Sequence, residues 1–152
     1  MENDVPSEFQ SGHSTAKKAA ALLVAKRFVI PTGRQRQNLL VAFAKKGKVV
    51  YGKAFDVVKV AVSIDLDDLA DVERQLSNIT VFEIKSSRKK LRSGFGGFFF
   101  SLTGAEVLVA QSLKKQFKFV LVNTVTGEYL ELSLSDIFSR AKGIYPSWSI
   151  CF

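Results

Sequence analysis

The feature that most constrains this chain is a short alternating segment at residues 81–87, Val-Phe-Glu-Ile-Lys-Ser-Ser. Such alternation predicts a β-strand with one buried face, because successive side chains of a strand point to opposite faces. Phe82 and Ile84 would share the buried face, and Glu83 and Lys85 would lie about 7 Å apart on the other. This acidic and basic pair is either a solvated ion pair or the kind of pair that metal-dependent phosphodiester cleavage needs.

Length and composition limit the classes of protein to consider. The chain has 152 residues, which favours one domain with a sizeable core over two domains. A single cysteine, Cys151, and a single histidine, His13, exclude a disulfide framework and a cysteine or histidine metal cluster. No apolar run is long enough to span a membrane, and the polar N-terminus does not fit a secretory signal. We therefore expect a cytosolic protein.

The charge of the chain favours a polyanionic partner. The formal net charge is +8, and nucleic acid is the commonest partner of a surface this basic. Two groups of basic residues stand out, one directly after the alternating segment and one in a polar stretch that we expect to be an exposed loop. These are Arg88, Lys89, Lys90 and Arg92 in the first group, and Arg34 and Arg36 in the second. We predict that both groups bind phosphates.

The pattern along the chain predicts a mixed α/β (α+β) fold with a central β-sheet flanked by helices. Residues 1–13 are predicted to form a flexible arm, and residues 14–152 a single domain. Ser14 is expected to cap the first helix, and Ser101 or Thr103 a later helix that ends near residue 116. The remaining expected elements are strands at 49–51, 54–62, 117–122 and 129–132, an acidic helix at 65–77 and a terminal helix at 136–142.

The order of these elements resembles a known nuclease superfamily. A helix, a strand with an aspartate, a strand with Glu-x-Lys, a helix and a further strand are similar to the PD-(D/E)XK, or restriction-endonuclease-like, superfamily. The Glu-x-Lys element is Glu83-Ile84-Lys85, and the preceding aspartate would be Asp56. Two departures are that no proline precedes Asp56 and that the acidic helix separates it from Glu83. Asp65 or Asp67 is therefore the alternative second acid.

A second similarity follows the motif. Residues 97–106 and 118–123 are similar to a nuclease-like domain of unknown function found in some restriction and helicase proteins. There, too, a Glu-x-Lys strand precedes an aromatic residue, a helix cap and a glutamate.

The superfamily resemblance implies roles for individual residues. Asp56 and Glu83 would bind Mg²⁺ (or Mn²⁺), with the backbone carbonyl of Ile84 as a further ligand, and Lys85 would orient or activate water. Gln111 and Lys115 on the next helix either face the scissile phosphate or lie on a solvated helix face. Glu106 either belongs to the site or is an ordinary acid in the first turn of a helix.

The function implied by the resemblance is that of a magnesium-dependent endonuclease acting on DNA in restriction, homing, transposition or repair. Cutting both strands needs two active sites, so we expect a homodimer or a partner subunit. The alternative is a non-catalytic nucleic-acid-binding subunit of a larger complex that retains the fold. A basic RNA-associated protein is a third hypothesis.

Overall fold

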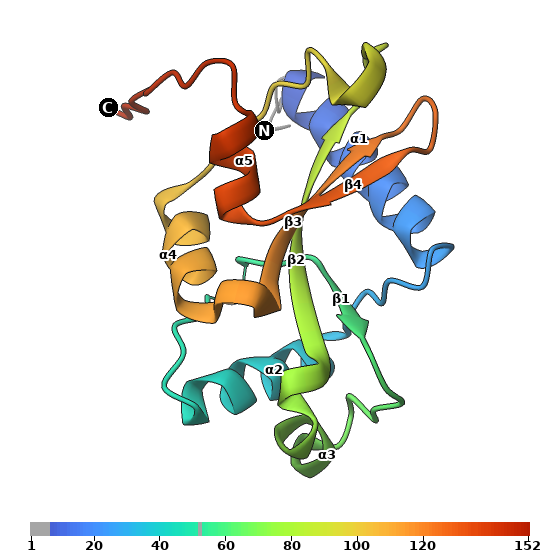
Figure 1. Ribbon diagram of the computed structural model, residues 1–152, viewed down its shortest axis with the longest axis vertical. Coiled ribbons are helices and arrows are strands. Elements are labelled where there is room, and N and C mark those ends of the chain that lie inside the picture. The colour runs from blue at the N-terminus through green and yellow to red at the C-terminus, as the bar shows by residue number, and fades with distance from the viewer. Residues whose placement is uncertain (1–6, 52) are drawn as a thin grey trace, which may run out of the picture.

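The computed structural model describes the backbone of residues 7–51 and 53–152, and the side chains from residue 15 onward except residue 52. Helices and strands are interspersed along the described chain (Figure 1). In chain order they are α1 (Ser7–Val24), α2 (Gly33–Lys45), β1 (Val57–Val60), α3 (Leu69–Arg74), β2 (Ile79–Ser87), α4 (Gly104–Leu113), β3 (Phe117–Asn123), β4 (Tyr129–Leu132) and α5 (Leu134–Arg140). Short 3-10 turns lie at Leu76–Asn78, Ser93–Phe95 and Lys114–Gln116.

The strands form one mixed sheet in the order β1-β2-β3-β4. The β1–β2 and β3–β4 pairs are antiparallel, whereas β2 and β3 are parallel. Parallel neighbours need a long crossover, and α4 lies within the one that joins β2 to β3. The predicted fold class, a mixed sheet flanked by helices, is confirmed.

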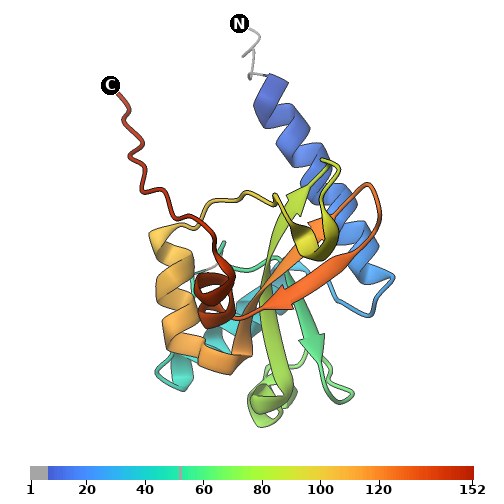
Figure 2. The same cartoon turned by 45° about the horizontal axis from the view of Figure 1, so that its top comes forward.

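Two apolar clusters cover the two faces of the sheet. On one face, Phe82 of β2 packs with Phe28, their ring centroids 5.1 Å apart, together with Ala19 and Leu23 of α1. On the other face, Val81 belongs to the larger cluster, to which α2, α4 and α5 contribute. Figure 2 shows α1 well apart from α4 and α5. Since Phe82 and Ile84 pack toward α1, Glu83 and Lys85 point to the face that carries α4, as the alternation predicts.

The first helix begins earlier than predicted. It starts at Ser7 rather than after a cap at Ser14, so residues 7–13 of the expected arm are helical. Residues 1–6 of that arm lie outside the described residues. The physical reason is that adding residues to an existing helix costs far less free energy than forming its first turn. The alanine-rich middle of α1 forms the helix, and residues 7–13 extend it.

The prediction of a loop around Arg34 and Arg36 is wrong, because both residues lie in the first turns of α2. Thr32 Oγ1 accepts a hydrogen bond from the Gln35 amide at 3.2 Å, and Gln35 Oε1 accepts one from the Thr32 amide at 3.0 Å. This reciprocal capping box starts the helix, and Leu39 and Phe43 bury its apolar face. Arg34 and Arg36 are therefore helical residues.

Several other boundaries also differ from the predictions. No strand forms at residues 49–51, and the strand expected at 54–62 is reduced to β1. The acidic helix expected at 65–77 starts only at Leu69, because the Asp68 side chain accepts from the Ala70 amide and caps it there. Of the two predicted caps for α4, Thr103 is the one observed. Within the described chain, no helix has the length and hydropathy to cross a membrane.

Replacing Phe82 by alanine should destabilise the protein strongly, because its buried ring packs edge-on against Phe28. A fully buried phenylalanine typically costs about 3–5 kcal/mol when it is truncated to alanine. The free energy of unfolding from urea denaturation, followed by circular dichroism, measures this loss. Phe99→Ala is the matched control and should change stability by less than about 0.5 kcal/mol, since Phe99 is exposed. Equal losses in the two variants would contradict the assigned core.

Candidate active site

Asp56 and Glu83 face each other across the first two strands. Val57 pairs with Phe82, so Asp56, one residue before β1, comes opposite Glu83. The Asp56 amide donates to the Phe82 carbonyl at 2.7 Å, and Asp56 Oδ2 accepts from the Ile84 amide at 2.9 Å. The carboxylate thus accepts a hydrogen bond that a backbone carbonyl of the neighbouring strand would otherwise accept. This contact lies just before β1 begins, and it holds the Asp56 side chain beside β2.

The Glu83 carboxyl is buried without a complete set of partners. Its side chain is only 15% exposed, and Oε2 is buried with no hydrogen-bond partner. Burial, the charges of Asp56 and Glu106, and a hydrogen bond to Asp56 raise the pKa of Glu83 to about 9, whereas the neighbouring Lys85 lowers it. A carboxyl in this environment binds either a proton or a cation at neutral pH.

Lys85 lies between two acids. Its Nζ is 2.9 and 3.0 Å from the two carboxylate oxygens of Glu106, and 3.8 Å from Glu83 Oε1. The side chains of Lys85 and Glu106 are 14% and 7% exposed, so this is a nearly buried ion pair. Glu83 and Glu106 thus place two carboxyl groups beside one ammonium group, and Asp56 adds a third next to Glu83, which leaves an excess of negative charge for a cation to balance.

Glu106 has two structural roles at once. Its Oε1 accepts from the Thr103 amide at 2.9 Å, and Thr103 Oγ1 accepts from the Glu106 amide at 3.1 Å, which completes a capping box. The same carboxylate binds Lys85. Glu106 is therefore an acid in the first turn of α4, as one interpretation of the sequence has it, and it also contacts Lys85 of the Glu-x-Lys pair.

The donors around Glu83 fit a magnesium ion held by few protein ligands. Within the described residues, no three His, Cys, Asp or Glu side chains converge as a metal-binding group. Asp56 and Glu83 are two carboxylates, and Ile84 can add a backbone carbonyl. The Ile84 amide points toward Asp56, and the amide and carbonyl of one strand residue point to the same side. Mg²⁺ commonly takes one or two carboxylates and keeps several waters, and the unpartnered Glu83 Oε2 is a suitable donor.

The alternative acids Asp65 and Asp67 have other partners. Both are exposed and precede α3. Asp65 Oδ1 accepts from the Asp67 amide at 3.0 Å, and Asp67 Oδ2 accepts from the Gln35 side chain at 3.2 Å. The structure thus brings Asp56, and not these two residues, to Glu83.

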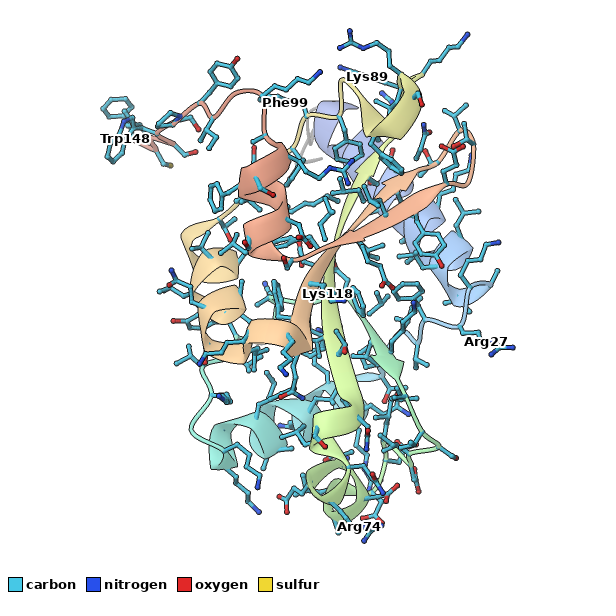
Figure 3. The ribbon with its side chains drawn as sticks, viewed as in Figure 1. Arg27, Arg74, Lys89, Phe99, Lys118 and Trp148 are labelled. Carbon is cyan, nitrogen blue, oxygen red and sulfur yellow. The ribbon has the colours of Figure 1, made fainter. Side chains whose placement is uncertain are left out.

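The basic residues after β2 lie at one end of the molecule. Arg88, Lys89, Lys90 and Arg92 are all exposed in the turn that follows the strand, and Figure 3 shows Lys89 at this end. Arg36 lies elsewhere: its guanidinium stacks 4.5 Å from the ring centroid of Phe55 and donates to the Phe55 carbonyl. Because Phe55 precedes Asp56, Arg36 supports the chain that carries the acid. Arg34 is exposed in the first turn of α2.

Gln111 and Lys115 are not brought to Glu83. Both are exposed, and Lys115 follows α4 in the 3-10 turn. It stands nine residues beyond Glu106, about 13 Å along a helix axis. The contact that sequence reasoning missed is the one between Glu106 and Lys85. The Thr-x-x-Glu signal at 103–106 predicts the cap, but only the crossover from β2 through α4 brings that cap to Lys85.

Comparisons with known proteins give no further identification: no protein-family model, curated protein or solved structure matches this chain significantly.

Stability without metal should fall as the pH rises, because folding raises the pKa of Glu83 from 4.5 to about 9. Between these two values the folded protein holds a proton on Glu83 that the unfolded chain has released. The stabilisation of the folded state by this proton is therefore complete below pH 4.5 and lost above pH 9. Denaturant unfolding in EDTA across this window measures the slope, and Glu83→Gln should flatten it. Mg²⁺ should restore stability at the alkaline end. An identical slope in Glu83→Gln would assign the dependence to other groups.

Glu106→Gln should lower the free energy of unfolding by about 3 kcal/mol, because it breaks a nearly buried ion pair. This value is at the lower end of the range for such pairs, since Glu83 remains near Lys85 as a second acid. Glutamine preserves the cap at this position, so the change removes the charge that holds Lys85. Asp136→Asn is the control, since Asp136 completes an equivalent capping box on α5 but is exposed. It should cost about 1 kcal/mol or less in the same unfolding measurement. Similar costs would show that Glu106 acts only as a cap.

Proposed function

We propose that this protein is an intracellular magnesium-dependent endonuclease that hydrolyses phosphodiester bonds of DNA. The observation that supports this most directly is the pairing of Asp56 with Glu83, whose buried Oε2 has no hydrogen-bond partner, directly beside Lys85. Two acids and a lysine at adjoining strands provide a place for a cation and a positive charge for the phosphate or the water.

Each residue has a definite role in this proposal. Asp56 and Glu83 hold Mg²⁺ or Mn²⁺ through their carboxylates, and Ile84 contributes its carbonyl. When bound, such an ion stabilises charge on the phosphate and makes a bound water more acidic. The Lys85 ammonium, held in place by Glu106, donates a hydrogen bond to the attacking water or to a phosphate oxygen. Glu106 positions Lys85, and Arg36 supports the backbone before Asp56.

The surroundings of the site fit a nucleic acid substrate. The net charge is +8, and the exposed basic turn begins three residues after Lys85. Phosphate contacts from such a turn provide affinity for any sequence, while base contacts provide specificity. A cut through both strands then needs a second site, from a second copy of the chain or from a partner subunit.

A second candidate function is non-catalytic nucleic-acid binding within a larger complex. It is favoured by the double contact between Lys85 and Glu106, which occupies the ammonium group that hydrolysis would use. In this case the acids and the lysine stabilise the fold, and the basic turn binds the nucleic acid.

Nicking of supercoiled plasmid in Mg²⁺, compared with EDTA, tests the proposal. Asp56→Asn and Glu83→Gln should each lower the nicking rate by at least about 100-fold, since losing a metal ligand costs no less than losing a residue that supports one. Asp65→Asn and Asp67→Asn are matched controls and should nick at nearly the wild-type rate, because they lie away from Glu83. All four variants should bind DNA in EDTA as the wild type does.

The outcomes separate the two candidates. Wild-type protein that binds plasmid tightly without nicking it in Mg²⁺ or Mn²⁺ supports the binding subunit. Nicking that persists in Glu83→Gln, or that is lost in Asp67→Asn but not in Asp56→Asn, contradicts the assigned site.

A further inference from the structure

A pocket of about 270 Å³ lies where β2 ends and the basic turn begins. Ser86, Ser87, Arg88 and Lys89 line it from the end of β2, Thr15 lines it from α1, and Phe99 lines it from the segment before α4. Figure 3 shows Lys89 and Phe99 at the same end of the molecule. The pocket thus combines hydroxyl groups, two cationic side chains and an aromatic ring.

Phe99 differs from the phenylalanines around it. Phe95, Phe98 and Phe100 pack against the larger core cluster, and their rings form a chain with centroids 6.0 and 5.6 Å apart. Phe99, between two of them in sequence, is 76% exposed. The packed neighbours on both sides fix the backbone, so the Phe99 ring is held at the surface rather than in the core.

Backbone contacts hold the turn between the two halves of the pocket. The Arg92 amide donates to the Gly96 carbonyl at 3.0 Å, and the Gly96 amide donates to the Arg92 carbonyl at 3.2 Å. Gly94 and Gly97 have φ values of 68° and 86°, which suit glycine. The cationic side and the aromatic side are therefore connected through a structured turn, and less ordering is needed when a ligand binds.

The sequence around the pocket carries charge of one sign. Between Glu83 and Glu106 there is no acidic residue, whereas Lys85 and four residues of the turn are basic. A polyanion is the ligand that this charge complements. The exposed Phe99 ring can stack only on a base whose face is free. Duplex DNA does not offer such a face, because its paired bases are already stacked on each other. Unpaired bases, in contrast, stack readily on aromatic side chains.

We infer that this pocket binds an unpaired nucleotide of single-stranded nucleic acid, with the base stacked on Phe99 and the adjoining phosphates on Arg88 and Lys89. The inference rests on the proposed function for the choice of nucleic acid as the ligand, and it names the substrate class of that site. Ser87 is two residues beyond Lys85 on the same strand, about 7 Å away. The preferred substrate is therefore a nucleic acid with a single-stranded segment beside the bond to be cut.

Fluorescence anisotropy with labelled oligonucleotides in EDTA tests the inference without any cleavage. The probe is oligothymidine of about 16 nucleotides, the upper site size of common single-strand-binding folds, alongside a blunt duplex of equal length. Phe99→Ala should weaken binding of the single strand about 5- to 150-fold, the range for losing one stacked base, and should leave duplex binding nearly unchanged. Phe138→Ala removes another exposed phenylalanine, on α5, and should change neither.

A second pair of variants tests the phosphate contacts. Arg88→Gln combined with Lys89→Gln should weaken binding and reduce the slope of log affinity against log salt, by about 0.7 per charge for the single strand. The matched control is Lys26→Gln with Arg27→Gln, an exposed basic pair just after α1, and Figure 3 shows Arg27 away from Lys89. This control should change the slope less than the pocket pair.

The inference is overturned if Phe99→Ala binds the single strand as tightly as the wild type. It is also overturned if this variant loses affinity for the single strand and for the duplex by the same factor. It is also overturned if the control pair lowers the salt slope as much as Arg88 and Lys89 do. The same titrations with oligodeoxyuridine and oligouridine, which differ only in the sugar, identify the sugar that the pocket accepts, and Phe99-dependent binding of any of these oligonucleotides supports the inference. Such binding without any plasmid nicking refutes only the nuclease. Glu83-dependent nicking with unchanged binding by Phe99→Ala refutes only the pocket.

Discussion

The structure depends on β2 being paired on both sides, antiparallel to β1 and parallel to β3. Because neighbouring side chains of a strand alternate, a shift of one residue in this register would exchange its faces. Phe82 would then leave the cluster around Phe28, and Glu83 would enter it. The apolar face of β2 therefore specifies where its charged face points. The core and the candidate active site are two consequences of one strand register.

The same register creates an unfavourable concentration of charge. Asp56 stands opposite Glu83, and α4 returns the chain so that Glu106 reaches Lys85. Three carboxyl groups are then gathered in a largely buried place near one ammonium group, and burial together with the charges of Asp56 and Glu106 raises the pKa of Glu83. Burying carboxyl groups that must bind a proton or a cation costs free energy and adds nothing to the stability of the strand. This unfavourable free energy is the physical reason to expect a function at this point.

The charged face of β2 leads directly into the basic turn. Glu83, Lys85 and Ser87 follow one another on that face, and Arg88 and Lys89 come next at the rim of the pocket. The proposed metal site and the proposed nucleotide pocket are thus neighbouring parts of one surface, with the acids beside the middle of β2 and the cationic and aromatic groups at its end. They remain separable because binding at the pocket needs no metal.

Local patterns in the sequence determined much of this protein. The alternation at residues 81–87 predicted the faces of β2, and the Thr-x-x-Glu signal at residues 103–106 allowed the cap of α4. The equivalent Thr-x-x-Gln pattern at residues 32–35 begins α2, and the prediction of a loop for Arg34 and Arg36 rests on the polar character of the segment without this pattern. Only the tertiary structure shows that Asp56, rather than Asp65 or Asp67, lies opposite Glu83, that Glu106 contacts Lys85, and that Phe99 is exposed. Each of these depends on which distant segments meet across the sheet, and the spacing of residues within one segment carries no information about that.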